Sequence, residues 1–158
     1  MRTLLLGFTL LTAFAASAHA DEAKLRGNLD AARAIVKADL DFAALAKKQG
    51  TAKAFRNAMD AEQGMVYAGA EQPATGRAAI YALMGGDAPD EVALEWAPVE
   101  AFAANSGELG VTRGRWTRTL IADTSKTATG SYVTVWHKNA KGEWKGLIDI
   151  GNPDKPKK

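Results

Sequence analysis

The 158-residue sequence lacks cysteine, and it has only two histidines, His19 and His137. The absence of cysteine excludes disulfides, thiol nucleophiles, thiolate metal sites and a lipid-anchored N-terminal cysteine. A zinc site would have to combine one imidazole with carboxylates, which is uncommon. We therefore expect no metal and no other cofactor, and a fold that depends on its hydrophobic core.

Long hydrophobic runs are also missing, except for one near the N-terminus. Arg2 precedes an uncharged apolar run from Thr3 to Ala16, and Ala18-His19-Ala20 forms an A-x-A cleavage signature before Asp21. This layout predicts a secretory signal peptide over residues 1–20, because the run is short for a membrane span. The alternative is an uncleaved membrane anchor. We expect a periplasmic or secreted protein that has no membrane contact after cleavage.

Excess charge of either sign is small. Removing Arg2 from the 20 lysines and arginines leaves 19, against 18 acidic residues. Nucleic-acid binding requires a basic face, and the only basic run is the short tail Lys155-Pro156-Lys157-Lys158. We therefore expect no nucleic-acid partner. Removing 20 of 158 residues leaves 138, which suits one domain with one core.

The first half of the mature chain is predicted to be mainly helical. Apolar residues such as Ile35 and Val36 recur every three or four positions, Gly50 interrupts the pattern, and Thr51 can cap a second helix. The expected elements are a polar segment at 21–28, helices at 29–49, 51–61 and 77–84, and a short strand at 65–67.

The second half changes to the alternating pattern of strands. Gly107 and Gly142 lie in two tight turns between them. The expected strands are 92–103, 108–122, 129–138 and 143–150, followed by a flexible tail at 152–158. Helices followed by an antiparallel meander predict an α+β domain over 29–151, with helices against one face of a curved sheet.

Several short motifs resemble a known family. They are PATGRAAI, EWAP, SGELG, the Gly-x-Trp of Gly114 to Trp116, GSYVTVW, and GEWK leading to Asp149. Their order and spacing resemble the SnoaL-like domains, in particular the group called domain of unknown function 4440. That group belongs to the nuclear transport factor 2-like, or cystatin-like, superfamily. The resemblance spans roughly residues 30–151.

This resemblance implies a cone, in which a bent sheet wraps around helices and leaves a pocket at the wide end. It also implies a possible homodimer, because many members dimerise through the outer sheet face. Some members are enzymes, including ketosteroid isomerase, scytalone dehydratase and limonene epoxide hydrolase, and others only bind ligands or partners. The catalytic motifs of those enzymes do not align with this chain, so no catalytic residue is carried over and the fold leaves the function open.

Strand alternation brings large aromatic side chains together. If the strands are in register, one sheet face carries Trp116, Tyr132, Trp136 and Trp144. This face is either a packed core or the wall of a ligand pocket. In the last strand, strict alternation places Ile148 on the face of Trp144 and Asp149 on the opposite face.

Asp39 is the best candidate for a catalytic residue. It lies four positions after Ile35 and three before Phe42, inside the apolar stripe of the first helix. A carboxylate there needs a partner or a wet pocket, and either can shift its pKa as a general acid or base requires. The alternative is a solvated position at the edge of the stripe. The expected ligand-binding residues are Asp39, Tyr67, Trp116, Tyr132 and Trp136.

Two further carboxylates could share the pocket. Asp149 ends the last strand and Glu95 precedes Trp96, and a second carboxylate beside Asp39 would suggest acid–base work. We expect Glu95 to pair instead with Arg113 or Arg115 on the outer sheet face, and the position of Asp149 stays open.

The remaining polar candidates are weaker. Tyr67 and Tyr81 could donate hydroxyl hydrogen bonds in the pocket, and Arg56 and Arg77 could bind an anionic ligand. His137 ends its strand, where a histidine is usually exposed and structural. No nucleophile-elbow motif accompanies it.

Three classes of function therefore remain. The protein binds a small, largely apolar molecule in the cone, or it is a metal-free lyase, isomerase or hydrolase with a pocket carboxylate as base. The third class is an interaction module that uses its sheet face. We favour the binding protein, because a cone pocket is expected and no catalytic pattern is present.

Overall fold

The computed structural model describes residues 23–69 and 71–155. The expected signal peptide and the last three residues of the expected tail lie outside the described residues. The three expected helices are confirmed as α2 (Leu29–Gln49), α3 (Thr51–Ala58) and α4 (Arg77–Leu83).

The boundaries of α2 follow from local chemistry. The Asn28 side chain accepts a hydrogen bond of 3.1 Å from the backbone N–H of Ala31, which satisfies one free donor of the first turn. At the other end Gly50 has φ 94°, a conformation that glycine adopts readily, and its N–H donates to the carbonyl of Ala46. This glycine lets α3 start immediately after α2 ends.

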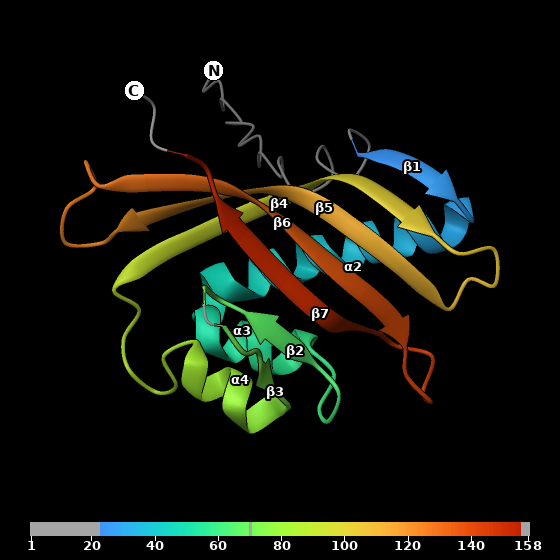
Figure 1. Ribbon diagram of the computed structural model, residues 1–158, viewed down its shortest axis with the longest axis horizontal. Coiled ribbons are helices and arrows are strands. Elements are labelled where there is room, and N and C mark those ends of the chain that lie inside the picture. The colour runs from blue at the N-terminus through green and yellow to red at the C-terminus, as the bar shows by residue number, and fades with distance from the viewer. Residues whose placement is uncertain (1–22, 70, 156–158) are drawn as a thin grey trace, which may run out of the picture.

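One seven-stranded sheet forms the other layer, with the strand order β1-β4-β5-β6-β7-β2-β3. Its strands are β1 (Lys24–Gly27), β2 (Met65–Tyr67), β3 (Ala74–Thr75), β4 (Val92–Ala103), β5 (Leu109–Leu120), β6 (Thr127–Lys138) and β7 (Trp144–Pro153). The four long strands β4 to β7 are the expected antiparallel meander, and Figure 1 shows them side by side. The short strands extend the meander at both edges.

Strand β1 was not expected, because the segment 21–28 is mostly polar. Residues Lys24 to Gly27 pair in parallel with Glu100 to Ala103 of β4. The pairing comes from the free backbone groups of β4, and the side chains of Lys24 and Arg26 stay exposed.

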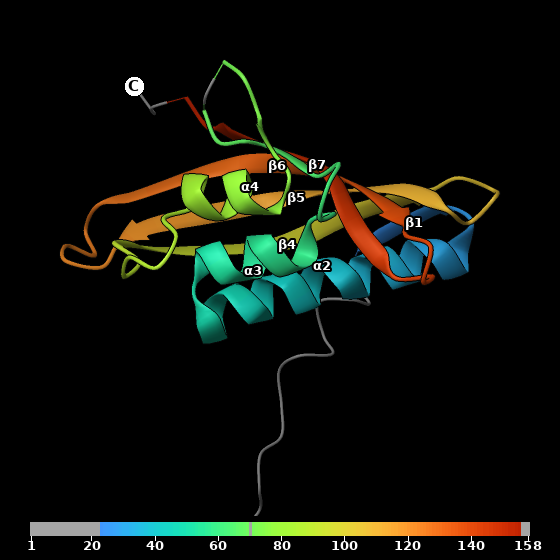
Figure 2. The same ribbon diagram turned by 90° about the horizontal axis from the view of Figure 1, so that it is seen from below.

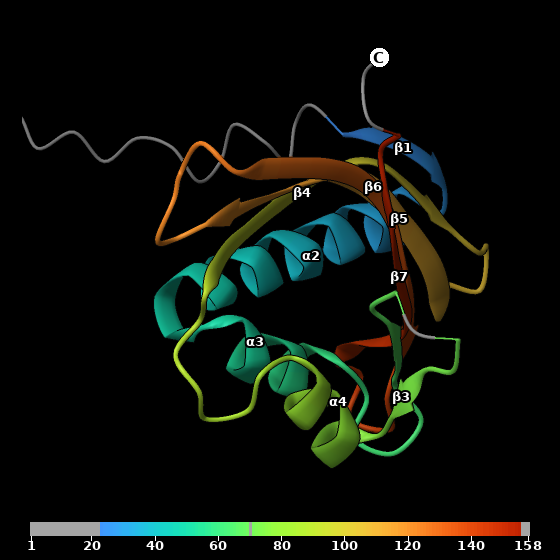
Figure 3. The same cartoon turned by 60° about the vertical axis from the view of Figure 1, so that its left-hand side comes forward.

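All three helices lie on one side of the sheet, as Figure 2 shows. The sheet curves around α2, α3 turns back beside the last part of that helix, and α4 lies next to α3 (Figure 3). This α+β arrangement confirms the expected cone-like packing of helices on one face of a curved sheet.

The core lies between α2 and the concave face of the sheet. Ile35, Val36 and Phe42 are buried at or below 3 % exposure, and burying each contributes about 1.5–3 kcal/mol. The Phe42 ring meets the rings of Phe55 and Trp96 edge-on, with centroids 4.7 Å away in both cases. These contacts anchor α2 to α3 and to β4.

A β-bulge in β7 reverses the alternation expected for its second half. Val135 pairs with Ile148, but the next residue of β6, Trp136, pairs with Gly146, so Leu147 is an extra residue. The prediction that Ile148 shares a face with Trp144 is therefore wrong, because an extra residue shifts the alternation by one position. The bulge turns Asp149 toward the helices.

The charged pairs on the outer sheet face also differ from expectation. Arg113 pairs with Glu100 at 2.7 Å, and the Arg115 guanidinium binds Asp154. We expected Glu95 to pair with one of these arginines. Its carboxylate instead lies 3.6 Å from the amine of Lys47. The prediction for Glu95 is wrong, because other carboxylates occupy both guanidinium groups.

The end of the sheet extends into the segment expected to be a tail. Strand β7 continues to Pro153, and Asp154 accepts a hydrogen bond of 2.7 Å from Thr129. The first residues of the segment 152–158 are therefore part of the sheet and its contacts.

Candidate ligand cavity

A cavity of about 830 Å³ opens between the concave sheet face, α3, α4 and the loops that follow β2 and α4. Its aromatic lining consists of Phe55, Tyr67, Trp96, Trp116 and Tyr132. The sheet also contributes Leu94, Arg118, Ala128, Asp149, Gly151 and Pro153. This is a largely apolar wall with a few charged groups, the usual composition of a small-molecule site.

Glycines on neighbouring strands make room for the two aromatic side chains of β5 and β6 that line the cavity. Trp116 pairs with Gly130, where a Cβ would come within 2.2 Å of the indole. Tyr132 pairs with Gly114, where a Cβ would come within 2.5 Å of the phenol ring. Each ring therefore lies over a strand position that has room only for glycine, which lacks a Cβ.

Asp39 is the centre of a buried hydrogen-bond network behind this wall. It is 0 % exposed, accepts a 2.8 Å bond from the Tyr132 hydroxyl and accepts a 2.9 Å bond from the Trp96 indole N–H. Burial raises the pKa of Asp39 to about 6, although hydrogen bonds from Thr112, Tyr132 and Trp96 favour the carboxylate. Tyr132 and Trp96 line the cavity, so Asp39 fixes the orientation of both.

Tyr132 acts as a hydrogen-bond donor within this network. Burial, followed by the nearby Asp39 carboxylate, raises the pKa of the Tyr132 hydroxyl far above its ordinary value. The hydroxyl therefore stays protonated and donates to Asp39 at any physiological pH.

Asp149, unlike Asp39, lines the cavity itself. Its Oδ2 accepts a 2.6 Å hydrogen bond from the Thr134 hydroxyl, and the residue is half-buried. Burial, together with the charge of Asp39, raises the pKa of Asp149 to about 7. Among the described residues, Oδ1 of Asp149 has no hydrogen-bond partner. Every fully buried side-chain oxygen in the same residues does have one, so Oδ1 is not fully buried. Oδ1 is therefore accessible to a molecule in the cavity.

The two carboxylates have different capabilities. Asp39 is enclosed, with both oxygens occupied, and it holds the wall in place. Asp149 has a free oxygen and a pKa near neutrality, so it can accept or donate a proton at neutral pH. Of these two carboxylates, Asp149 is the one that lines the cavity.

The five residues predicted to bind ligand occupy three kinds of position. Tyr67, Trp116 and Tyr132 line the cavity, and Asp39 lies directly behind it. Trp136 is 1 % exposed in the core, where its indole N–H donates a 2.8 Å bond to the hydroxyl of Thr112.

The other polar candidates lie outside the cavity lining. The Tyr81 hydroxyl donates a 2.6 Å bond to Asp87, and the Arg56 guanidinium lies 4.4 Å from the centre of the Tyr81 ring. Arg77 is exposed at the start of α4. The contacts of Tyr81 stabilise the region around α4, and neither Tyr81 nor the two arginines are among the residues that line the cavity.

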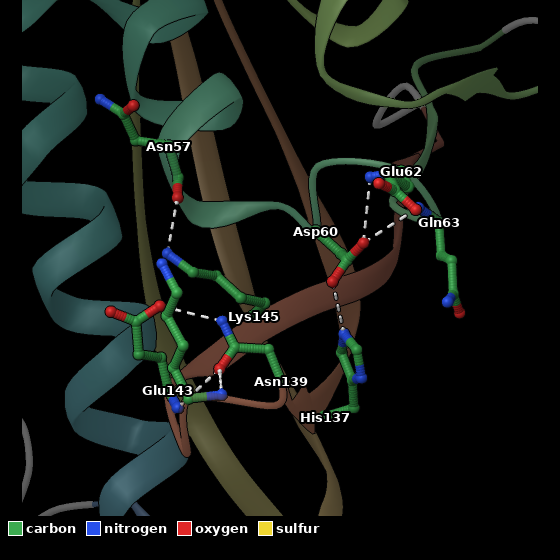
Figure 4. Close-up of polar contacts among 9 residues, drawn as sticks. Asn57, Asp60, Glu62, Gln63, His137, Asn139, Glu143 and Lys145 are labelled. Atoms are coloured by element: carbon green, nitrogen blue, oxygen red, sulfur yellow. Dashed lines mark hydrogen bonds and ion pairs between the residues drawn. The ribbon is translucent and has the colours of Figure 1, made fainter.

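His137 belongs to a separate cluster at the far end of β6 (Figure 4). Its Nε2 lies 3.0 Å from Oδ2 of Asp60, whose Oδ1 accepts bonds from the backbone N–H groups of Glu62 and Gln63. Hydrogen bonding, chiefly from the Gln63 N–H, lowers the pKa of Asp60. His137 is half-buried here and supports the loop that leads to β2.

Trp96 and the orientation of Asp149 were not recognised from the sequence. Trp96 was noted only as the neighbour of Glu95, although alternation along β4 places it beside Trp116. Strict alternation alone places Asp149 on the opposite face, and its position stayed open because the bulge is not visible in the residue pattern. Gly146, a glycine inside a strand, was the one available sign of such a bulge.

Residues 23–69 and 71–155 contain neither a membrane-spanning helix nor a cluster of metal ligands. No helix in this part of the chain is long and apolar enough to cross a membrane. The same residues contain no group of three or more histidine, aspartate or glutamate side chains placed to hold a metal ion.

Comparisons with known proteins identify the fold. No protein-family model and no curated protein matches the sequence. A nuclear transport factor 2-like protein of unknown function from Pseudomonas putida is 14% identical and has a TM-score of 0.65, covering 80% of this chain and 89% of its own. A nuclear transport factor 2-like protein with a cystatin-like fold from Novosphingobium aromaticivorans is 19% identical, with a TM-score of 0.61 and coverages of 78% and 81%.

A third similar structure is a ketosteroid isomerase-like protein from Erwinia carotovora. It is 17% identical, has a TM-score of 0.58, and the match covers 78% of this chain and 96% of that protein. At these identities the likeness concerns the fold alone, and the name domain of unknown function 4440 has no matching family model. The helices packed on one curved sheet and these structural matches give the chain the nuclear transport factor 2-like, cystatin-like fold.

Proposed function

We propose that the protein binds a small, largely apolar molecule in the cavity, with a polar atom of that molecule at Asp149. The observation that carries the proposal is the cavity itself. Its volume of about 830 Å³ lies within the range of roughly 300–1,000 Å³ typical of ligand pockets. Five aromatic side chains supply apolar contact, and the accessible oxygen of Asp149 would orient the ligand through a polar contact.

A cavity-filling variant tests this proposal. Gly151 lines the cavity, and a Cβ there would meet the Trp116 ring only at ordinary contact distance, 3.4 Å. Gly151→Val therefore occupies the space without a backbone clash, whereas Asn152→Val changes the next residue, which is exposed. We expect a neutral fluorescent apolar probe, N-phenylnaphthylamine, to bind the wild type and Asn152→Val equally and Gly151→Val much more weakly. Equal binding by all three proteins would contradict the proposal.

A second candidate function is metal-free acid–base catalysis on the bound molecule, as a lyase, isomerase or hydrolase. The specific observation in its favour is the pKa of about 7 at Asp149, beside a free oxygen that faces the cavity. Once a ligand is identified, Asp149→Asn should retain binding and lose turnover. Turnover that survives this substitution would leave only the binding function.

We also propose that the protein is exported and forms a homodimer. The support for export is the signal-peptide layout of residues 1–20. The support for a dimer is the set of exposed apolar side chains that β4, β6 and β7 direct away from the helices: Phe102, Val133 and Ile150.

A further inference from the structure

Arg118 places a positive charge at one end of the cavity. It lies on β5, two residues after Trp116 and on the same sheet face, with Leu94 and Ala128 as its cross-strand partners. It lines the cavity and is exposed.

The opposite end of the cavity carries Asp149. That carboxylate lies in the row of Thr112 and Thr134, six residues from Arg118 along β5. Six residues of strand span about 20 Å. Arg118 and Asp149 therefore lie toward opposite ends of the cavity wall, with Trp116 and Tyr132 between them.

Unlike the arginines on the outer sheet face, Arg118 has no ionic partner among the residues that the structure describes. Arg113 pairs with Glu100, and Arg115 binds Asp154. Across residues 23–69 and 71–155, the structure gives the Arg118 guanidinium neither a hydrogen bond nor an ion pair. Its donors remain available to a ligand.

Two acidic residues of the lining do not remove this availability. The Asp90 carboxylate accepts a 3.0 Å bond from the backbone N–H of Thr51 and is committed to the start of α3. Glu91 precedes Val92, whose partner Leu120 lies two residues beyond Arg118, so Glu91 is farther from the aromatic wall. Along the sheet, Arg118 is nearer to Trp116 than Glu91 is.

We propose that the cavity selects an anionic amphipathic ligand, an apolar body with a carboxylate, sulfonate or phosphate group, and that Arg118 binds the anionic group. This inference rests on the proposed binding function and names the ligand class. A guanidinium fits such groups because two parallel N–H donors can reach two oxygens. The apolar body would then lie along Trp116, Trp96 and Tyr132.

Two probes that differ by one charged group test the inference. Anilinonaphthalene sulfonate and N-phenylnaphthylamine share the same aromatic body, and only the first carries a sulfonate. We expect the sulfonate to bind the wild type more tightly than the neutral probe. Added salt should weaken the sulfonate alone, because the ion pair is partly exposed.

Substitutions then locate the selectivity. Arg118→Gln should weaken sulfonate binding by about fivefold to tenfold and leave the neutral probe unchanged. Arg33→Gln, on the exposed face of α2, should change neither probe, and Glu91→Gln should leave sulfonate binding equal or slightly tighter. Melting temperatures of the variants check that each is folded.

The outcomes separate the two proposals. If the neutral probe binds but the sulfonate gains nothing from Arg118, the ligand class is wrong and the binding function stands. If neither probe binds, both proposals fall. If Arg118→Gln weakens both probes equally, Arg118 shapes the cavity without selecting an anion, and the inference is overturned.

Discussion

The Tyr132 hydroxyl donates a hydrogen bond to the Asp39 carboxylate at 2.8 Å, although the two residues are 93 positions apart in sequence. This contact joins α2 to the third long strand of the meander. It also fixes a ring that lines the cavity, because a donor–acceptor pair in a buried site holds its geometry more strictly than apolar packing does.

Replacing the carboxylate of Asp39 should destabilise the protein. In Asp39→Asn an NH2 group replaces one of the two carboxylate oxygens. That NH2 group cannot accept a hydrogen bond, so either the Tyr132 hydroxyl or the Trp96 N–H loses its acceptor. We expect the free energy of unfolding at neutral pH to fall by about 1–3 kcal/mol. Asp41→Asn, an exposed position on the same helix, should cost at most about 0.5 kcal/mol in the same urea titration. Equal losses in both variants would contradict the role of the network.

The stability of the protein should depend on the protonation of Asp149. Its pKa is raised from 3.8 to about 7 in the folded state, so the folded protein binds a proton that the unfolded chain releases. That contribution is fully present below about pH 4 and is lost as the pH rises through about 7. Asp149→Asn removes the ionisation and should be more stable than the wild type by about 1–3 kcal/mol at pH 8.

The control for this pH dependence has the opposite sign. The pKa of Asp60 is lowered in the folded state, so its contribution is present above 3.8 and is lost as the pH falls through the lowered value. Urea unfolding of Asp60→Asn should therefore show its loss of stability at neutral pH and none in strong acid. An unchanged pH profile in Asp149→Asn would show that Asp149 is not the group responsible.

Two glycines that face the Trp116 ring should respond differently to the same substitution. A Cβ at Gly130 would lie 2.2 Å from the indole and 2.3 Å from the backbone oxygen of Asn152, so Gly130→Ala should cost about 1–3 kcal/mol. A Cβ at Gly151 would lie 3.4 Å from the indole, and Gly151→Ala should be neutral or slightly stabilising. Thermal unfolding of the two variants measures the difference, and similar melting temperatures would argue against the tight fit at Gly130.

A dimer through the outer sheet face should depend on Phe102, whose side chain is 52 % exposed. Phe102→Asp would place a charge in that interface, so sedimentation velocity should show a dimer for the wild type and a monomer for the variant. Ile121→Asp changes a side chain that is also exposed, at 57 %, but lies just after β5, and it should leave the dimer intact. A monomeric wild type would exclude the dimer outright.

Export should remove residues 1–20. The intact mass of the protein recovered from the periplasm or medium of an expressing bacterium should match a chain that begins at Asp21. Replacing Ala18 and Ala20 with glutamate should block cleavage, because the peptidase requires small residues there. Full-length protein in the exported fraction, without that double substitution, would support the uncleaved anchor instead.

The sequence predicts the main elements because each has a strong period. Helix α2 was predicted with its observed bounds, since Ile35, Val36 and their apolar neighbours recur at helical spacing between Asn28 and Gly50. The long strands were predicted from alternation and from turn glycines. Strand β1 was missed because its stability comes from the free edge of β4 and not from its own residues.

The arrangement of the site was less accessible to sequence reasoning. The apolar stripe around Asp39 predicted an inward-facing carboxylate, but the identity of its donors depends on how β4 and β6 align against α2. One extra residue, Leu147, decides the face of Asp149, and neither alternation nor composition reveals it. Long-range register, which a single sequence does not encode in any local pattern, sets both contacts.

The short strands at the two sides of the sheet have a consequence for association between molecules. The outermost strands are short, β1 with four residues and β3 with two, and the part of β4 that β1 leaves uncovered, residues 92–99, contains Pro98 and a β-bulge. Ladder-type growth of one sheet onto another is therefore disfavoured, which guards against fibril formation in a chain with no disulfides. Contact between copies is left to side chains on the broad outer surface, where it can stop at a closed pair.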